Sequence, residues 1–593
     1  MVPLLVLLLL GQMAAVMVVT AVQQTPTIDE PVYVGTAVTY LEQHSLRYNP
    51  EHPPLAKLAM AAGLAFARPH LDPAFTGNQT ELGRHVLYEA GNDPYELMLL
   101  ARLPIIVLTL LFGLVVFAFA RDLAGPAGGL LALSLYAFSP DVITHGSLAT
   151  LDVPAVGFLL TAVWLTWRAR GRHRLGLYLP LAGVALGAAL ATRMSVLPAV
   201  PLILLFALLA ALPSRTAPLR ARGRALVGDL ARAAAVALGV LVVAVGVVWL
   251  VYLAVDPRLR WSDPSRLPDV AGLRGLMIEL LPFPEAYRDG MRVQFGFEDA
   301  TFGGFLFGRL YEGSLWYYLP AAFLVKTPLA MLVLWVAAVV AVLAVRRLRA
   351  AAPYLLLTPA VLFVVATTGS RDFGTRYAIF VPIFLAVAAG GLVLVRRPLL
   401  PALAGRARAD AGPVPAGGAR VDAGPVPARA DAVPLPAGSA RADAGPVPAG
   451  RACAGVVPVL AGVLAVLVAA SSLSTFPYYL PYANEAFGGP ARTHLYLHDS
   501  NVDWGQDLGR LADRLRTRYP GEEVWLVYKG AGVPEAYGIE ARNPLRAPEW
   551  EVRGLLVVSD TSVAKATGEL AALLATSGEP IDSVGHSINI YRR

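Results

Sequence analysis

Long runs of apolar residues recur along this chain and restrict its fold more than any other feature. A helix of about 20 apolar residues crosses the hydrocarbon core of a bilayer. Apolar residue types make up 56% of the 593 residues, and charged types make up 15%. Soluble domains carry about 25% charged residues, so this chain cannot cover its surface with polar groups. The sequence excludes a purely soluble or disordered protein and indicates a polytopic α-helical membrane protein.

About eleven segments are apolar enough to be candidate transmembrane spans. They lie near residues 2–21, 100–120, 126–140, 150–167, 175–191, 195–213, 231–255, 318–345, 354–369, 376–395 and 456–474. The first segment lacks a basic region before its long apolar run. We therefore interpret it as an uncleaved helix rather than a signal peptide.

Arginine clusters indicate the orientation, because Lys and Arg collect in cytoplasmic loops. Such clusters follow the fourth, sixth, eighth and tenth spans, at residues 168–174, 215–224, 346–349 and 396–397. All four fall on one side if the N-terminus is cytoplasmic, which predicts an N-in/C-out topology. Three polar regions then face outside: two loops at 22–99 and 256–317, and the C-terminal segment 475–593. The basic excess of +7 therefore orients helices and does not indicate a nucleic-acid partner.

The chain divides into a membrane module, a linker and a C-terminal domain. Residues 1–400 form the predicted membrane module together with its two external loops, and 456–474 is the last span. Residues 401–455 are rich in Pro, Gly and Ala and carry four imperfect copies of ADAGPVPAG. Such a composition favours extended, solvated chain without a packed core, so we interpret this stretch as a cytoplasmic linker.

The C-terminal segment 475–593 has the patterns of a small folded domain. Leu508, Leu511 and Leu515 recur at helical spacing, and VWLVYKG, GLLVVSD and SINIYRR are typical of short strands. The patterns predict an external α/β domain. Before the helix, DSNVDWGQDL holds residue types that bind sugars, although a simple turn explains it as well.

Charged residues in the first external loop are candidates for chemistry. Asp29 and Glu30 come directly after the first span, and Glu51, His52 and Lys57 belong to the stretch EHPPLAKL. Adjacent carboxylates supply a general base when burial and mutual repulsion raise one pKa. His52 and Lys57 are suited to an anionic group. On spacing alone, a carboxylate pair that caps an amphipathic helix is an equally good interpretation.

Four cations interrupt or border the predicted spans. They are Arg193, Lys326, Arg371 and Arg376, all in the outer half of the predicted topology. A charge within a membrane is costly and usually marks function, and guanidinium groups bind phosphate through paired hydrogen bonds. The alternative is that these side chains reach lipid headgroups. Asp152, at the start of the fourth span, either lines a cavity or caps its helix.

The motifs together resemble a known family. DE followed by HPPLAK is similar to the first external loop of the protein O-mannosyltransferase group, in family 39 of the membrane-embedded GT-C glycosyltransferases. Segments similar to bacterial members, some of which transfer aminoarabinose or mannose, are ATLDVP, GAALATRMS, LVKTPL, GTRYAIFVP, PYYLPYANEAFGGP and DSNVDWGQDL. The resemblance covers most of the chain except the repeats. It implies an inverting transferase that moves a sugar, mannose or a similar one, from a polyprenyl-phosphate carrier to an acceptor hydroxyl outside the membrane.

The resemblance also implies roles for the charged residues. Asp29 is the expected general base, with Glu30 as its catalytic neighbour. The expected binding residues for the donor phosphate are His52, Lys57, Arg193, Lys326, Arg371 and Arg376, and Glu51 and Asp152 are candidate cavity-lining residues. The transition state is oxocarbenium-like, and the departing phosphate needs cations. A divalent metal beside Asp29 and Glu30 is left open, because no complete ligand set is recognisable, and the lipid-linked sugar is the expected donor substrate.

The acceptor and a rival function stay open. Protein Ser/Thr, a lipid glycan and a cell-wall polymer all fit as acceptors, and the expected location is a bacterial plasma membrane with the active site facing outside. A transporter or flippase of lipid-linked sugars is the main alternative. It predicts an inverted repeat and helices broken at the midplane, and the sequence shows neither. A membrane scaffold that displays the C-terminal domain leaves the intramembrane charges unexplained.

Overall fold

The apolar runs form helices, which satisfy the backbone hydrogen bonds of a chain segment without help from water. The computed structural model describes residues 1–171, 174–212, 222–260, 267–395 and 455–593. The helices on the predicted spans are α1 (Val2–Gln23), α5 (Pro94–Ala137), α7 (Asp152–Ala169), α8 (Leu175–Leu190), α9 (Val200–Ala211), α10 (Arg222–Val255), α13 (Tyr318–Lys326), α14 (Leu329–Ala344), α15 (Thr358–Thr367), α16 (Phe380–Ala389) and α18 (Val456–Ser474).

Among the residues that the structure describes, five helical segments are long and apolar enough to cross a bilayer by themselves. They are Val2–Gln23, Pro94–Ala137, Met194–Ala211, Val227–Val255 and Val456–Ser474. Several shorter apolar helices accompany them in the bundle. A helical membrane protein is therefore confirmed, whereas the count of eleven spans and the N-in/C-out orientation stay predictions.

Two helix breaks occur in the bundle. One lies between two predicted spans, and the other lies within a single predicted span. In α5, Gly125 adopts a left-handed backbone conformation with φ of 77°, directly before Pro126. The break falls between the predicted spans 100–120 and 126–140. The predicted span 318–345 is not one helix but two, because Pro328 offers no backbone N–H and disfavours a helical conformation at Thr327.

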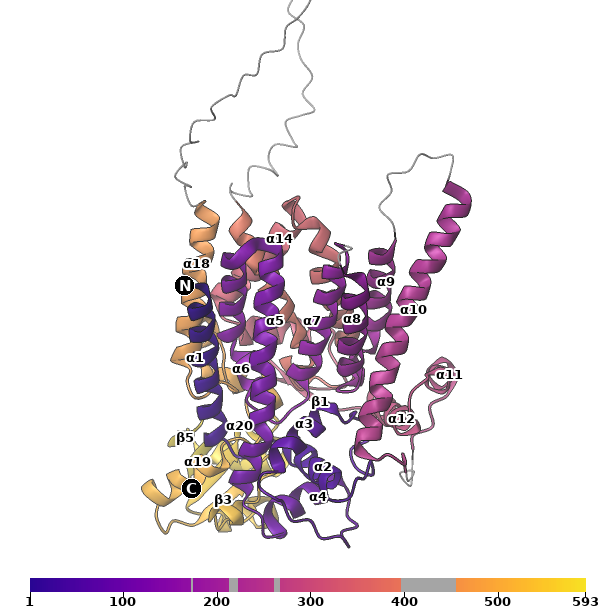
Figure 1. Ribbon diagram of the computed structural model, residues 1–593. Coiled ribbons are helices and arrows are strands. Elements are labelled where there is room, and N and C mark those ends of the chain that lie inside the picture. The colour runs from indigo at the N-terminus through magenta and orange to yellow at the C-terminus, as the bar shows by residue number, and fades with distance from the viewer. Residues whose placement is uncertain (172–173, 213–221, 261–266, 396–454) are drawn as a thin grey trace, which may run out of the picture.

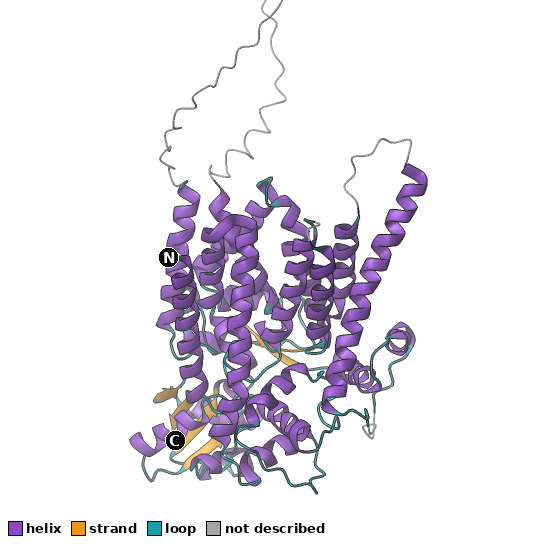
Figure 2. Ribbon diagram, viewed as in Figure 1, coloured by secondary structure: helices purple, strands orange, loops and turns teal. Residues whose placement is uncertain are grey.

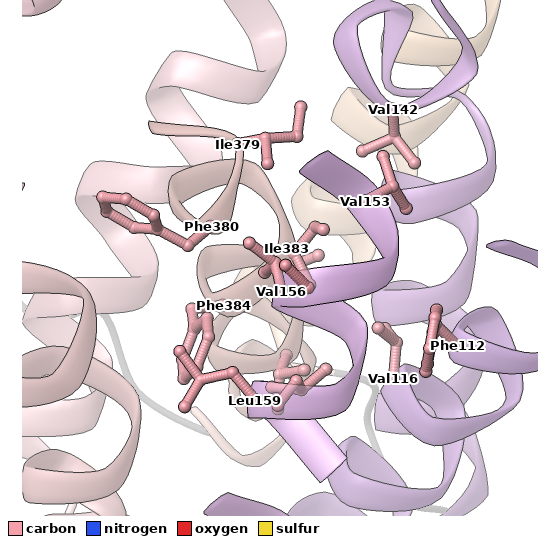
Figure 3. Close-up of a cluster of buried hydrophobic side chains, with 14 of the residues drawn as sticks. Phe112, Val116, Val142, Val153, Val156, Leu159, Ile379, Phe380, Ile383 and Phe384 are labelled. Carbon is pink, nitrogen blue, oxygen red and sulfur yellow. The ribbon is translucent and has the colours of Figure 1, made fainter. Parts of the chain in front are cut away.

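The core of the bundle lies where α5, α6 (Pro140–Gly146), α7 and α16 meet. Figure 3 shows its buried apolar side chains, among them Phe112, Val116, Val142, Val153, Val156, Leu159, Ile379, Phe380, Ile383 and Phe384. Within a bilayer these side chains stabilise the bundle through van der Waals packing, because lipid tails are as apolar as the protein core. The packing fixes the start of α7 and the turn before α16, which carry Asp152 and Arg376.

The three polar regions that the sequence predicts outside the membrane all lie at one end of the bundle (Figure 1). The first loop contains α2 (Glu30–Glu42), α3 (Leu55–Leu64), α4 (Gln79–Arg84) and the π-helix η1 (His85–Glu89). The second contains α11 (Gly272–Leu280), α12 (Glu285–Asp299) and an antiparallel hairpin of β1 (Gly303–Leu306) and β2 (Arg309–Glu312). This shared end agrees with the predicted grouping of the loops.

The C-terminal segment forms a small sheet at the same end (Figure 2). Its strands are β3 (Val524–Val527), β4 (Leu555–Ser559), β5 (Asp582–Val584) and β6 (Ile588–Arg592), in the order β3-β4-β6-β5. β3 and β4 are parallel, and the other pairs are antiparallel. Helix α19 (Leu508–Arg518) packs on one face and α21 (Gly568–Ser577) on the other. The predicted helix and the three predicted strands are all present, and β5 is an addition.

Short elements complete the described chain. They are η2 (Met194–Ala199), η4 (Arg349–Ala351), η5 (Pro353–Leu357), η6 (Thr375–Ala378), η7 (Gly390–Leu394), η9 (Glu485–Phe487), η10 (Pro490–Leu495), η11 (Asp499–Asn501), η12 (Pro534–Tyr537), η13 (Pro544–Arg546), η14 (Glu549–Glu551) and α20 (Asp560–Ala564). The predicted linker 401–455 lies almost wholly outside the described residues, so its interpretation stays a prediction.

Candidate active site

Asp29 and Arg376 form an ion pair at the loop end of the bundle. Asp29 stands directly before α2, and Arg376 belongs to η6, the turn before α16. The Arg376 Nη1 atom donates a hydrogen bond of 2.7 Å to Asp29 Oδ2, across 347 positions of sequence. The Asp29 side chain keeps 28% of its surface exposed. It makes no capping hydrogen bond to α2, so the interpretation of this carboxylate as a helix cap is not supported.

Two further arginines meet Arg376 around a single aromatic ring. The guanidinium carbon atoms of Arg376, Arg193 and Arg371 lie 5.0, 5.7 and 6.0 Å from the centre of the Tyr377 ring. Three of the four cations that the sequence singles out are therefore neighbours in space. The sequence analysis did not identify Tyr377, although it follows Arg376 directly.

Each of these arginines also has a carboxylate partner. Arg193 forms an ion pair with Asp152 at the start of α7. Arg371 Nη2 donates to Glu298 Oε1 of α12, at 2.9 Å. The cluster is therefore a set of pre-formed ion pairs, in which charges that have left water are compensated.

Glu30 departs from its predicted role. Its side chain is fully buried, and its two oxygens accept hydrogen bonds from Arg102 Nε at 2.7 Å, from Arg102 Nη2 at 2.6 Å and from the Ala149 N–H at 2.7 Å. The N–H and hydroxyl of Thr27 donate as well. Burial acts to raise the pKa of Glu30, yet the charge and hydrogen bonds of Arg102 hold it below the usual value. This geometry contradicts the expected pair of mutually repelling carboxylates.

Lys57 is a structural residue in this geometry. Its Nζ atom donates to Asn49 O at 3.0 Å, to Asn49 Oδ1 at 2.9 Å and to His52 O at 2.7 Å. The side chain is fully buried. An ammonium group has three N–H donors, so none remains for a donor phosphate. In this structure Lys57 holds the loop before α3, and its predicted phosphate contact stays a prediction.

In the same EHPPLAKL stretch, Glu51 is buried and His52 is partly buried. The His52 ring packs edge-on against Tyr33, with 5.6 Å between the ring centres. Burial, together with the charges of Arg193 and Lys57, lowers the pKa of His52 well below its usual value. A neutral imidazole offers a hydrogen bond to an anion but no charge. Glu51 Oε1 accepts from Asn49 Nδ2 and Gln79 Nε2, which occupies one of its oxygens within the loop.

Lys326 joins the bundle to the C-terminal segment. At the end of α13, its Nζ atom donates to Leu480 O at 2.5 Å and to Asn501 O at 2.7 Å. The residue keeps only 2% of its surface exposed. Lys326 is therefore engaged by backbone oxygens, in contrast to the three arginines around Tyr377. The predicted phosphate contact of Lys326 has no support in this arrangement.

Trp504 and Arg102 also border the site, and of these the sequence singled out only the stretch DSNVDWGQDL, which contains Trp504. The Trp504 ring lies 4.2 Å from the guanidinium carbon of Arg376, and Trp504 is 1% exposed. Arg102 pairs with Glu30 near the start of the predicted span 100–120. The rule that selected the other arginines, a charge at the edge of an apolar run, also applies to Arg102. Within the part of the chain that the structure describes, no group of three or more potential metal ligands is found.

Part of this bundle is similar to a known protein family. Residues 96–249, from α5 to α10 and about a quarter of the chain, match the family described as dolichyl-phosphate-mannose-protein mannosyltransferase. A search of curated proteins finds no match.

Solved structures resemble the chain only distantly. ArnT from Cupriavidus metallidurans in the apo state is 14% identical, with 99% of this chain and 97% of that chain covered and a TM-score of 0.41. The Archaeoglobus fulgidus oligosaccharyltransferase is 13% identical, over 96% and 72% of the two chains, with a TM-score of 0.41. The S. cerevisiae protein O-mannosyltransferase Pmt1-Pmt2 complex bound to the sugar donor is 19% identical over 43% of this chain, with a TM-score of 0.32. That match spans 33% of the yeast chain.

These TM-scores all lie below 0.5, whereas the family match covers a defined part of the chain. It falls on the apolar helices that flank Asp152 and Arg193. It agrees with the resemblance carried by the sequence motifs, and residues 96–249 are similar to that mannosyltransferase family.

Proposed function

We propose that this protein is an inverting glycosyltransferase that uses a polyprenyl-phosphate-linked sugar as donor. One observation carries the proposal: the part-exposed carboxylate of Asp29 lies against Arg376, within a cluster that includes Arg193 and Arg371. Such a cluster supplies both a base for an acceptor hydroxyl and cations for a leaving phosphate.

The reaction is a single displacement. Asp29 accepts the proton of the acceptor hydroxyl while the hydroxyl oxygen bonds to the anomeric carbon of the sugar. The bond between that carbon and the carrier phosphate breaks, and its electron pair stays on the phosphate oxygen. Attack opposite the leaving group inverts the configuration, through an oxocarbenium-like transition state. The arginines stabilise the negative charge that develops on the phosphate.

Because Asp29 is paired with Arg376, the donor must bind before Asp29 accepts a proton. Before the donor binds, the carboxylate of Asp29 neutralises Arg376, so neither charge is left unpaired. A donor phosphate that enters the cluster takes over Arg376 and releases the carboxylate. Asp29 then becomes free to accept a proton only when the leaving group is in place, which protects the donor from premature attack by water.

The family match and the fold support the proposed donor and its surroundings. The matching family description names dolichyl-phosphate mannose, which supports mannose or a similar sugar on a lipid carrier. The carrier tail belongs in the bilayer and its phosphate at the interface, where the loop end of the bundle lies in the predicted topology. A bacterial plasma membrane with this end outside is part of the proposal. Protein Ser/Thr, a lipid glycan or a cell-wall polymer would accept the sugar.

The decisive experiment measures sugar transfer by purified protein in nanodiscs. It uses radiolabelled polyprenyl-phosphate sugars and a membrane extract as acceptor, with Asp29→Asn in parallel. Loss of a general base typically lowers the rate by about 10²–10⁴-fold. Asp513→Asn, on the exposed surface of α19, is the matched control and should transfer normally. Asp29→Asn that keeps more than a tenth of wild-type turnover would remove the base role.

A second variant tests the phosphate contact. Arg376→Ala removes a charged hydrogen-bond donor, for which a contribution of about 1.5–3 kcal/mol is usual. We expect kcat/KM for the donor to fall by about 10–150-fold, with the protein still folded and inserted. An unchanged dependence on donor concentration would refute the phosphate role. Movement of the lipid-linked sugar between liposome leaflets without any transfer would favour the transporter.

A further inference from the structure

A polar stretch of the C-terminal segment is buried more deeply than a surface turn would be. Residues 499–508, DSNVDWGQDL, are here called the bridging segment. All its residues are buried, including Asp499, Ser500, Asn501, Asp503, Gln506 and Asp507. Buried polar groups need hydrogen-bond partners. Some of its partners belong to the C-terminal domain, among them Lys529, Thr561 and Ser587. The others lie in distant parts of the chain, and two sets of them border the proposed site.

One set of partners directly precedes Asp29. The N–H of Ile28 donates to Trp504 O at 3.0 Å, and the N–H of Thr25 donates to Gln506 O at 3.0 Å. The Thr25 hydroxyl also donates to Gly505 O at 3.2 Å. The bridging segment therefore pairs with the extended chain between α1 and α2, next to the residue proposed as the base.

The other set of partners directly precedes Arg376. The Thr375 N–H donates to Asn501 Oδ1 at 3.1 Å, and the Ser500 hydroxyl donates to Phe373 O at 2.6 Å. The Trp504 ring covers the guanidinium of Arg376. Asn501 is itself fixed, because Lys326 donates to its backbone oxygen and its side-chain amide donates to the hydroxyl of Tyr318.

We propose that the bridging segment sets the separation and orientation of Asp29 and Arg376, with Asn501 and Trp504 as positioning residues. The two members of the ion pair come from distant loops, and the same ten residues hold the backbone beside each of them. A plain turn before α19 would need none of these contacts. The catalytic consequence rests on the proposed function, whereas the positioning itself does not. A site held this way keeps its reacting groups pre-organised, which transfer reactions require.

Trp504 provides the kinetic test. Trp504→Leu removes the aromatic face beneath Arg376, and Trp504→Phe retains it. Trp525→Leu is the matched control, because Trp525 is also buried and lies beside an arginine, but in β3 of the sheet. We expect Trp504→Leu to lower kcat at least tenfold and Trp504→Phe to stay within threefold of wild type. Trp525→Leu should change the melting temperature but not kcat.

Three kinetic outcomes would overturn the inference. The first is an equal loss of kcat in Trp504→Leu and Trp525→Leu at equal loss of melting temperature, which would show that the segment only stabilises the fold. The second is a Trp504→Phe variant no more active than Trp504→Leu. Transfer that depends on Asp29 but is unaffected by Trp504→Leu would overturn the positioning role and leave the proposed function standing.

Hydrogen–deuterium exchange tests the positioning without turnover. Asn501→Ala removes the acceptor of the Thr375 N–H, so we expect the peptide covering 373–378 to exchange at least tenfold faster. Asn543→Ala is the matched control, because Asn543 accepts the N–H of Leu545 in the same way but far from the site. Unchanged exchange at 373–378 would refute the positioning. If the wild type transfers no sugar, the proposed function fails and this measurement still decides the inference.

Discussion

Replacing Arg102 by Met probes how firmly the first loop is tied to the bundle. The Arg102 guanidinium donates to both carboxylate oxygens of Glu30 and to the backbone oxygens of Ala21, Gln24 and Thr25. Both charged side chains are at most 1% exposed. The substitution leaves a buried carboxylate without its cation and three carbonyl groups without a donor, while it keeps most of the side-chain volume.

The expected loss of unfolding free energy is large, and an exposed ion pair of the same chain serves as the control. Removing one partner of a buried ion pair costs about 3–5 kcal/mol. Arg84 and Glu89 form a pair at 2.8 Å whose side chains are 61% and 47% exposed. Exposed pairs contribute about 0–1 kcal/mol, so Arg84→Met should change stability little. Adding Glu30→Gln to Arg102→Met should recover part of the loss, because no charge then remains unpaired.

The loss should also depend on pH in a defined direction. In the wild type the pKa of Glu30 lies below 4.5, so the pair stabilises above that pH and its contribution disappears as the pH falls through the lowered value. Without Arg102, burial raises the pKa of Glu30. The variant is then destabilised above about pH 4.5, and the gap to the wild type should narrow as the pH approaches 4.

Unfolding in mixed micelles, followed by tryptophan fluorescence between pH 4 and 7.5, measures these differences in free energy. A loss for Arg102→Met below about 1 kcal/mol at pH 7 would match an exposed pair and refute the reasoning. A gap that stays constant down to pH 4 would show that Glu30 is not the group responsible.

Three further predictions use other parts of the chain. Burial, and then the charges of two neighbouring aspartates, raise the pKa of Asp560 from 3.8 to about 8. The free energy of unfolding should therefore fall as the pH rises between these values, by up to about 1.4 kcal/mol per pH unit. In Asp560→Asn, the melting temperature should vary less between pH 5 and pH 8 than in the wild type. Lys57→Met should cost about 1–3 kcal/mol in unfolding experiments, because three oxygens lose their donor. A raised donor KM at unchanged stability would instead restore its phosphate role. Deleting 405–450 should leave turnover within about twofold, since Pro- and Gly-rich chain forms no packed core, and a larger loss would contradict the linker interpretation.

The apolar runs predict the helical architecture well, because a helix in lipid depends mainly on its own sequence. Length and hydropathy identify the segments without any knowledge of their neighbours. The breaks are harder to predict, since α13 and α14 are separated by a single proline within one apolar run. The sequence pattern predicts strands that are mostly apolar, such as β4, but it does not predict the short polar strand β5.

The candidate site was predicted in part, and the failures share a cause. The rule that charges within apolar runs mark function selects Arg193, Lys326, Arg371 and Arg376. The three arginines converge on Tyr377, whereas Lys326 donates to backbone oxygens, and the functional roles of all four stay predictions. Sequence gives the cost of burying a charge but not its partner, and the partner decides between chemistry and structure.

The contact between Thr25 and Gly505 also bears on how the protein is made. It joins residues 480 positions apart, so the ribosome must add more than four fifths of the chain before the first loop can adopt its final conformation. A nascent chain that ends before the bridging segment can insert its first helices, but it cannot assemble Asp29 and Arg376 in their final geometry. Under the proposed function, incomplete translation products would lack the assembled site and would transfer no sugar.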